Sequence, residues 1–252
     1  MPIFTIKTAD HVARVHALFE STKIFCAEYL TEEPEEFSVS VSEADIEFER
    51  EKSAKEDALE GIPVRNFSDA YLETIAVQRK ITEKLFEYDT LLFHGSVIAV
   101  DGEAFLFTAK SGTGKSTHTR LWREVFGSRA VMINDDKPFL RITEKDIIAF
   151  GTPWNGKHRL SQNIAMPLSA ICILERGEEN RIAEISPKEA LMMLFQQSNR
   201  PQNKLLMPKY LDLIDNLAKK LRFFRLYCNM EKEAALVSYR GMTKRKDQKH
   251  ED

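Results

Sequence analysis

The stretch SVIAVDGEAFLFTAKSGTGKST, residues 96–117, is the part of the chain that decides the fold. Two β-rich runs, residues 96–100 and 103–108, are separated only by Asp101-Gly102. Asp-Gly between such runs favours a tight hairpin, because glycine readily adopts the positive φ that the turn requires. The stretch therefore predicts an antiparallel hairpin whose second strand leads directly into a glycine-rich loop.

The loop AKSGTGKST, residues 109–117, matches the phosphate-binding pattern G-x-x-x-x-G-K-[ST], with Ala109 at the first glycine position. Gly112 and Gly114 let the backbone curl so that successive N–H groups point into one concavity. The positive end of the helix expected over residues 115–126 adds to this phosphate site. We therefore expect a nucleoside triphosphate such as ATP to bind here. The expected contacts are Ser111, Gly112, Thr113, Gly114, Lys115, Ser116 and Thr117.

Side chains beside the loop have the character needed for phosphoryl chemistry. Lys115 is expected to reach the β- and γ-phosphates, and the Ser116 hydroxyl suits Mg²⁺. Asp135 and Asp136 follow an apolar strand expected over residues 130–133. One carboxylate can hold the metal ion, and the second can act as a base toward an acceptor hydroxyl. The alternative is that one aspartate only caps a turn.

Other polar residues are candidates with strong structural alternatives. His94 precedes Gly95 before the hairpin, and a lone histidine is usually structural. The loop GTPWNGKH, residues 151–158, combines glycines, an aromatic ring, an amide and a cation, which suits a polar substrate and equally an ordinary turn around a buried tryptophan. The candidate substrate residues are Trp154, Asn155, Lys157 and Arg200.

Together these residues resemble the catalytic domain of HPr kinase/phosphorylase and the wider phosphoenolpyruvate-carboxykinase-like fold. The resemblance covers about residues 90–175, and it rests on His94-Gly95, the phosphate loop and the aspartate pair. It implies an α/β fold with a P-loop-containing mixed sheet. It also implies proton and phosphoryl chemistry for His94 and Asp135, and a metal-binding role for Asp136. We therefore expect Asp135 to take the acceptor proton with His94 assisting, Lys115 to hold the phosphates, and Ser116 to share the metal with Asp136.

The chain also departs from that family. The glycine-rich signature that the family places after the aspartate pair is missing, and residues 151–158 stand in its region. The first third shows no match to the bacterial enzyme's regulatory domain. These departures argue against HPr itself as the acceptor. Two kinds of acceptor stay open, a small hydroxyl compound and a peptide or protein serine.

The remaining sequence suggests three parts: a small acidic N-terminal α+β region over residues 1–65, a P-loop kinase-like nucleotide-binding domain over 66–242, and a disordered tail over 243–252. In the first part, alternation over residues 37–42 indicates a strand. Further expected elements are a helix over 14–29, a polar loop over 52–61, helices over 69–89, 187–195, 211–221 and 231–239, and strands over 139–142, 147–150, 168–174 and 223–228.

Composition narrows the class of protein. A net charge of −3 and a pI near 6.1 give no global reason to expect nucleic acid or an anionic membrane as a partner. No apolar run reaches the length of a bilayer span, and we read no signal peptide, so a cytoplasmic location is expected. Three cysteines without metal-ligand spacing are expected as reduced thiols. By resemblance, a homo-oligomer is among the expected assemblies.

The leading hypothesis is an ATP- and Mg²⁺-dependent kinase with an alcohol group as acceptor. The alternative is a nucleotide-binding regulatory ATPase or switch module that makes no phosphorylated product. The aspartate pair favours chemistry, because a switch needs only one carboxylate linked to the metal.

Overall fold

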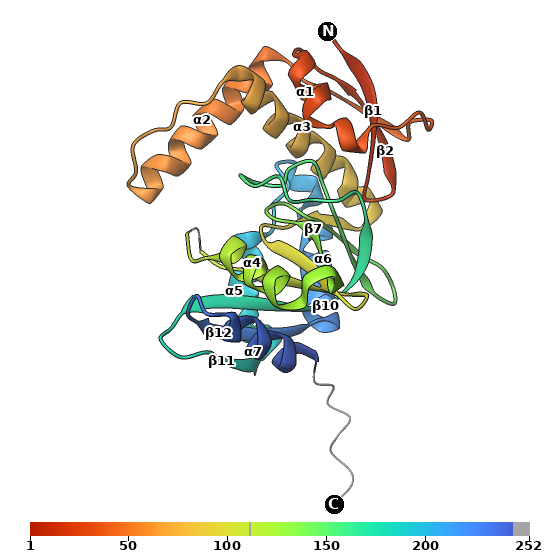
Figure 1. The fold of residues 1–252 in the computed structure, drawn as a ribbon. Helices are drawn as coiled ribbons and strands as arrows, with labels where there is room; N and C mark the ends of the chain where they lie inside the picture. The colour runs from red at the N-terminus through yellow and green to blue at the C-terminus, as the bar shows by residue number, and fades with distance from the viewer. Residues whose placement is uncertain (111, 244–252) are drawn as a thin grey trace, which may run out of the picture. The chain divides into compact units, whose positions relative to one another are not determined.

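The computed structural model describes residues 1–110 and 112–243. The chain divides into two compact units, Met1–Tyr88 and Asp89–Asp252 (Figure 1). Ser111 and residues 244–252 lie outside the described residues, so the expected disordered tail is not described beyond Thr243, which ends the last helix.

The first unit is built on a three-stranded sheet of order β1-β2-β3. Strand β1 (Ile3–Thr8) pairs antiparallel with β2 (His11–His16), and β2 pairs parallel with β3 (Phe37–Ser40). The helices of this unit are α1 (Glu20–Phe25), η1 (Ala27–Tyr29), α2 (Glu43–Glu60), α3 (Asp69–Leu85) and η2 (Phe86–Tyr88).

Two expectations in this unit are wrong. Residues 14–29 form the end of β2, the short helix α1 and a 3-10 turn, rather than one helix. Residues 52–61 belong mostly to α2, not to a polar loop. Helix α2 begins at a capping box between Ser42 and Asp45, and it ends at Gly61, whose φ is 68°. Because α2 buries few side chains, its sequence carries little apolar periodicity.

Helix α3 packs within the first unit, although the expected boundary at residue 65 places it in the second. Glu73 accepts a hydrogen bond from the Phe19 N–H at 3.1 Å, which ties α3 to the start of α1. Arg79 pairs with Asp45 at 3.1 Å and with Glu49 at 2.5 Å, which ties α3 to α2. The first unit therefore extends to Tyr88.

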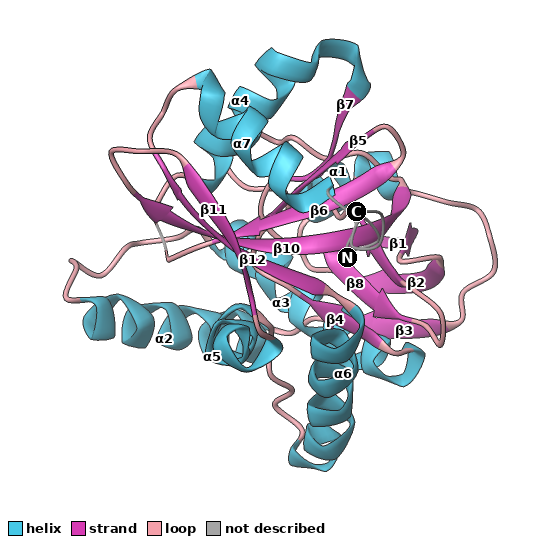
Figure 2. Cartoon of the chain, turned by 90° about the horizontal axis from the view of Figure 1, so that it is seen from below, coloured by secondary structure: helices cyan, strands magenta, loops and turns pink. Residues whose placement is uncertain are grey.

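The second unit contains a nine-stranded mixed sheet in its described part (Figure 2). The main path has the order β4-β8-β9-β10-β6-β5-β7, and β12 joins β10 to β11. Among the described residues of this unit, the parallel pairs are those of β10 with β6 and with β12. The strands are β4 (Thr90–Leu92), β5 (Ser96–Val100), β6 (Glu103–Thr108), β7 (Ala130–Asn134), β8 (Phe139–Ile142), β9 (Ile147–Phe150), β10 (Ala165–Arg176), β11 (Arg181–Ile185) and β12 (Arg222–Cys228).

The predicted hairpin is confirmed. Strands β5 and β6 pair antiparallel with Val100 opposite Glu103. The turn residues Asp101 and Gly102 have φ values of 55° and 84°. Positive φ at both central positions is the geometry that favours Asp-Gly in two-residue hairpins. The predicted strands around residues 144–146 are also confirmed as an antiparallel pair.

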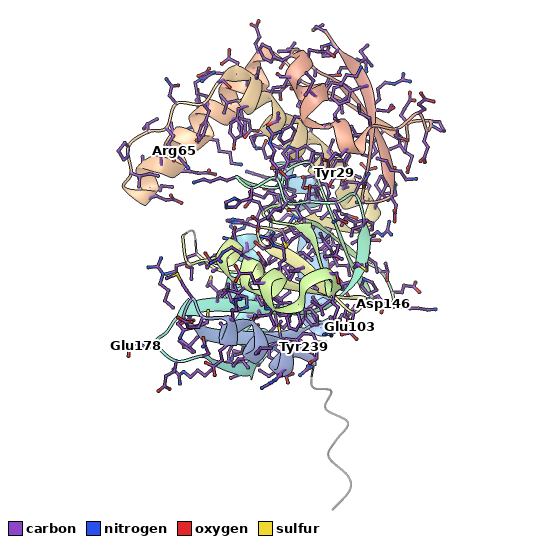
Figure 3. All side chains as sticks on the ribbon, in the orientation of Figure 1. Tyr29, Arg65, Glu103, Asp146, Glu178 and Tyr239 are labelled. Carbon is purple, nitrogen blue, oxygen red and sulfur yellow. The ribbon has the colours of Figure 1, made fainter. Side chains whose placement is uncertain are left out.

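Four α-helices accompany this sheet: α4 (Lys115–Phe126), α5 (Pro187–Gln197), α6 (Met207–Lys220) and α7 (Lys232–Thr243). Two 3-10 turns, η3 (Gly127–Arg129) and η4 (Lys204–Leu206), precede β7 and α6. Helices α4 and α7 lie side by side, and Trp122 of α4 is fully buried between them and the sheet. Tyr239 of α7 donates its hydroxyl to Asp101 at 3.1 Å, which joins α7 to the hairpin (Figure 3). None of the described helices has the length and apolar character needed to cross a membrane.

Candidate functional site

The glycine-rich loop connects the end of β6 to the start of α4, as the sequence predicts. Gly112 and Gly114 have φ values of 74° and 121°, in the region that favours glycine. The Lys115 ammonium lies 3.5 Å from the Ala109 carbonyl, so its side chain folds back over the loop. The Lys115 ammonium therefore lies close to the backbone of the loop itself.

Arg176 is a contact of this loop that the sequence reading missed. It is the last residue of β10, and its guanidinium donates to the Gly112 carbonyl at 2.7 Å. Strand β10 runs parallel to β6, so both strands end beside the loop. Only this pairing brings Arg176 to the loop, and no local motif marks it.

The sheet places the aspartate pair at the same end. Strand β5 lies between β6 and β7 and is antiparallel to both, so its first residue, Ser96, sits beside the carboxyl ends of both neighbours. The Ser96 hydroxyl donates to the Asp135 carboxylate at 3.0 Å and to the Asp135 carbonyl at 2.9 Å. The Ser116 side chain also acts on Asp135 by lowering the pKa of its carboxyl. Asp135 thus faces the first turn of α4.

Asp136 has different neighbours. Its carboxylate lies 3.2 Å from His94 Nε2, and its carbonyl accepts the Gly95 N–H at 2.9 Å. The His94 backbone is fixed in turn, because its N–H donates to the Gln197 carbonyl at 2.7 Å and its carbonyl accepts the Thr108 hydroxyl at 2.9 Å. His94 and Asp136 form a second pair beside the first.

Burial and charge act differently on these groups. Burial raises the pKa of Asp135, against the opposing hydrogen bonds from Ser96 and Ser116. Burial also acts to raise the pKa of Asp136, but the hydrogen bond from His94 and the nearby Lys137 cation together hold this pKa below its ordinary value. Burial lowers the pKa of both His94 and Lys115. At His94 this effect of burial opposes the hydrogen bond with Asp136, which acts to raise the same pKa.

The structure joins the predicted residues in a different combination from the expected one. The sequence reading expects His94 to assist Asp135, and Ser116 to share the metal with Asp136. In the structure His94 Nε2 lies 3.2 Å from the Asp136 carboxylate, and the Ser116 side chain acts on the pKa of Asp135; the expected roles stay predictions. His94, Lys115, Ser116 and the two aspartates nevertheless belong to one end of one sheet.

The loop of residues 151–158 also approaches the aspartates. A Cβ on Gly156, whose φ is 69°, would meet the Asp136 Cβ at 3.2 Å. Trp154 is buried, and its ring packs edge-on against Phe139. This environment fits the alternative interpretation of the loop, an ordinary turn around a buried tryptophan. The Asn155 amide donates to the Ser161 hydroxyl at 2.6 Å.

The other two substrate candidates, Lys157 and Arg200, are exposed. Arg200 lies two residues after Ser198, which forms a β-bridge with Phe93. Arg200 therefore comes near the strand end that leads to His94. Substrate contacts by these residues, and by Trp154 and Asn155, stay predictions.

Two further buried polar residues, Asn134 and Thr152, were missed. Asn134 ends the apolar run of β7, and a polar residue there is the signal that could have found it. Thr152 carries no such signal, because its role depends on contacts with a strand that lies eighteen residues away.

Comparisons with known proteins give a family and a likeness to solved structures. No curated protein matches the chain significantly. The chain is similar to the solved structure of the Hpr(Ser) kinase/phosphatase from Coxiella burnetii, at 12% identity over 50% of this chain and 90% of that one. The TM-score of that pair is 0.29, and a likeness at this level supports no conclusion on fold or function. The family model described as SynChlorMet cassette protein ScmC matches residues 64–240, and the chain therefore belongs to the ScmC family.

Proposed function

We propose that this protein is an ATP- and Mg²⁺-dependent kinase that transfers the terminal phosphoryl group to a hydroxyl of a small molecule or of a peptide or protein serine. One observation carries the proposal: the turn after β7 presents Asp135 to Ser116 and Asp136 to His94. Ser116 and Asp135, which suit a metal ion, thus lie beside His94 and Asp136, which suit proton transfer. Both pairs are next to the glycine-rich loop that carries Lys115.

The loop residues 109–117 and the first turn of α4 would bind the phosphates. The free N–H groups at a helix N-terminus favour anions, and Gly112 and Gly114 give the preceding backbone its curled form. Lys115 adds a cation whose burial makes its attraction for phosphate stronger than that of an exposed lysine. Arg176 would keep the loop in place through its bond to the Gly112 carbonyl.

Ser116 and Asp135 fit a magnesium ion. Both offer hard oxygen donors, and the Ser116 side chain is near enough to Asp135 to lower the pKa of its carboxyl. Mg²⁺ takes one or two carboxylates and completes its shell with phosphates and water. When bound, the ion would neutralise charge that develops on the transferred group. This assignment replaces the expected pair of Ser116 and Asp136.

Asp136 and His94 would serve the acceptor. The acceptor hydroxyl would give its proton to the Asp136 carboxylate as its oxygen bonds to the γ-phosphorus. The bond from that phosphorus to the bridging oxygen breaks, and ADP leaves. The His94 imidazole at 3.2 Å would orient Asp136. A low pKa at Asp136 is tolerated, because positioning and charge neutralisation supply most of the rate in phosphoryl transfer.

The main rival is a regulatory nucleotide-binding module without a phosphorylated product. Such a module needs only the Ser116–Asp135 pair beside the loop. The second pair, Asp136 with His94, has no use in a simple switch, and it favours a transferase.

Transfer can be tested with terminally labelled ATP, Mg²⁺ and a desalted extract split into metabolite and protein fractions. We expect label in one fraction with the native chain, and none with Lys115→Ala or Asp136→Asn. Lys145→Ala is the matched control, since Lys145 is exposed in the turn between β8 and β9. Tight ATP binding without transfer in either fraction would move the proposal to the regulatory module.

A further inference from the structure

Asn134 is a fully buried amide whose polar atoms are all used. Its Oδ1 accepts the backbone N–H groups of Asp136 at 2.8 Å and of Lys137 at 2.7 Å. Its Nδ2 donates to the carbonyl of Thr152 at 3.1 Å and to the Thr152 hydroxyl at 3.0 Å. An amide side chain offers two lone pairs and two hydrogens, so the hydrogen-bonding capacity of Asn134 is filled.

Thr152 closes this network from the other side. Its side chain is fully buried, and its hydroxyl donates to the Lys137 carbonyl at 2.7 Å while it accepts from Asn134. Lys137 is thus held at both its N–H and its carbonyl, by Asn134 and Thr152 respectively. The turn that carries the two aspartates is therefore fastened to the loop that begins at Gly151.

The backbones around this network are closely packed. A Cβ on Gly151 would lie 1.8 Å from the Gln162 carbonyl oxygen and 2.8 Å from the Ile133 carbonyl oxygen. Gly156 approaches Asp136 in the same way, with 3.2 Å to its Cβ. Close approach at both ends of the loop, with hydrogen bonds between them, makes a rigid unit of the turn and the loop.

We propose that Asn134 and Thr152 are positioning residues that lock the Asp135-Asp136 turn to the loop of residues 151–158. Their hydrogen bonds to the turn go to its backbone, from which both carboxylates project. The catalytic part of this inference rests on the proposed function. The loop and the aspartates move as one body, so a group bound by the loop keeps its place relative to Asp136.

A purely structural role does not require this pattern. Two apolar residues of similar volume would fill such a space without the free-energy cost of burying polar groups. A buried polar network is stabilising only where each of its polar groups has a hydrogen-bond partner. Here every bond of the Asn134 side chain is directed at the turn or at the loop. The network therefore fixes the conformation of the turn in addition to filling space.

The first test measures hydrogen exchange of single backbone amides by NMR on the full chain without nucleotide. Asn134→Ala removes the acceptor of the Asp136 and Lys137 amides, so we expect these two to exchange at least about tenfold faster. Amides of β12 should keep their native rates, which separates a local effect from global loss of stability. Unchanged exchange at Asp136 and Lys137 would overturn the proposal, whether or not the protein is a kinase.

The second test is kinetic and uses Thr152→Val, which keeps the shape but removes the hydroxyl, and Thr152→Ser, which keeps the hydroxyl. We expect kcat for ATP consumption to fall about 10- to 100-fold in Thr152→Val, as is typical for groups that orient a site from behind. Affinity for MgATP should change little, because the Thr152 hydroxyl bonds to Asn134, Lys137 and Trp154 rather than to the described residues of the phosphate loop. Thr152→Ser should restore most of kcat. Equal kcat in Thr152→Val and the native chain would contradict the positioning role. A native chain that consumes no ATP would instead refute the proposed function.

Discussion

At the scale of single residues, the site depends on two adjacent carboxylates with different surroundings. Side chains that follow one another after a strand point in different directions. Asp135 meets Ser96 and Ser116, whereas Asp136 meets His94. The sequence was enough to select both aspartates, His94 and Ser116. It could not pair them, because the pairing depends on the β5–β7 register, which shifts between Val97 and Ile98.

Neutralising the two carboxylates should therefore affect metal binding and phosphoryl transfer differently. Asp135→Asn removes the charge beside Ser116, so we expect weaker Mg²⁺-dependent nucleotide binding, measurable by titration with Mn²⁺ and paramagnetic resonance. Asp136→Asn should leave that binding largely intact and abolish transfer, because it removes the group that takes the proton. The opposite pattern, with metal binding lost only in Asp136→Asn, would restore the assignment made from sequence.

At the scale of elements, prediction succeeded where apolar pattern and turn chemistry agree. The β5–β6 hairpin, α4 and the capped start of α5 at Ser186 all have strong local signals. The prediction for the residues of α2 was wrong, because this helix is mostly exposed and polar. Strands β1 and β11 were not predicted at all. Long-range contacts decide such elements, and a sequence window does not contain them.

One such contact gives a pH-dependent prediction for the first unit. Asp57 near the end of α2 is buried and accepts the Arg65 N–H at 2.7 Å and the Arg65 Nε at 3.0 Å (Figure 3 labels Arg65). These hydrogen bonds hold the pKa of Asp57 below its ordinary value. The stabilisation is therefore present above the unfolded pKa of about 3.9, and it is lost as the pH falls through the folded pKa.

We expect Asp57→Asn to melt at a lower temperature than the native chain at pH 7, in thermal unfolding followed by circular dichroism. The difference should hold down to about pH 4 and shrink below it, because the native carboxylate then becomes protonated. Glu51→Gln, an exposed change on the same helix, is the matched control. A difference that is independent of pH would show that Asp57 does not act through its charge.

At the scale of the whole molecule, the chain has two compact units, and the residues of the candidate site all belong to the second. The sequence indicated two parts but set the boundary at residue 65, because the contacts of α3 with α1 and α2 are invisible in the sequence. The family match begins at residue 64 and so includes α3. The mixed α/β sheet of the second unit agrees with the expected class, and the parallel pairing of β10 with β6 brings Arg176 to the loop.

We propose that the loop of residues 109–117 binds a nucleoside triphosphate together with Mg²⁺. Equilibrium titration of ATP into the full chain, with and without Mg²⁺, tests it most directly. We predict one saturable site that Mg²⁺ strengthens. Lys115→Ala should weaken it by about tenfold or more, as expected for a lost charge-assisted hydrogen bond, and Lys145→Ala should bind like the native chain. Absence of binding, or equal binding by the Lys115→Ala variant, would contradict the account.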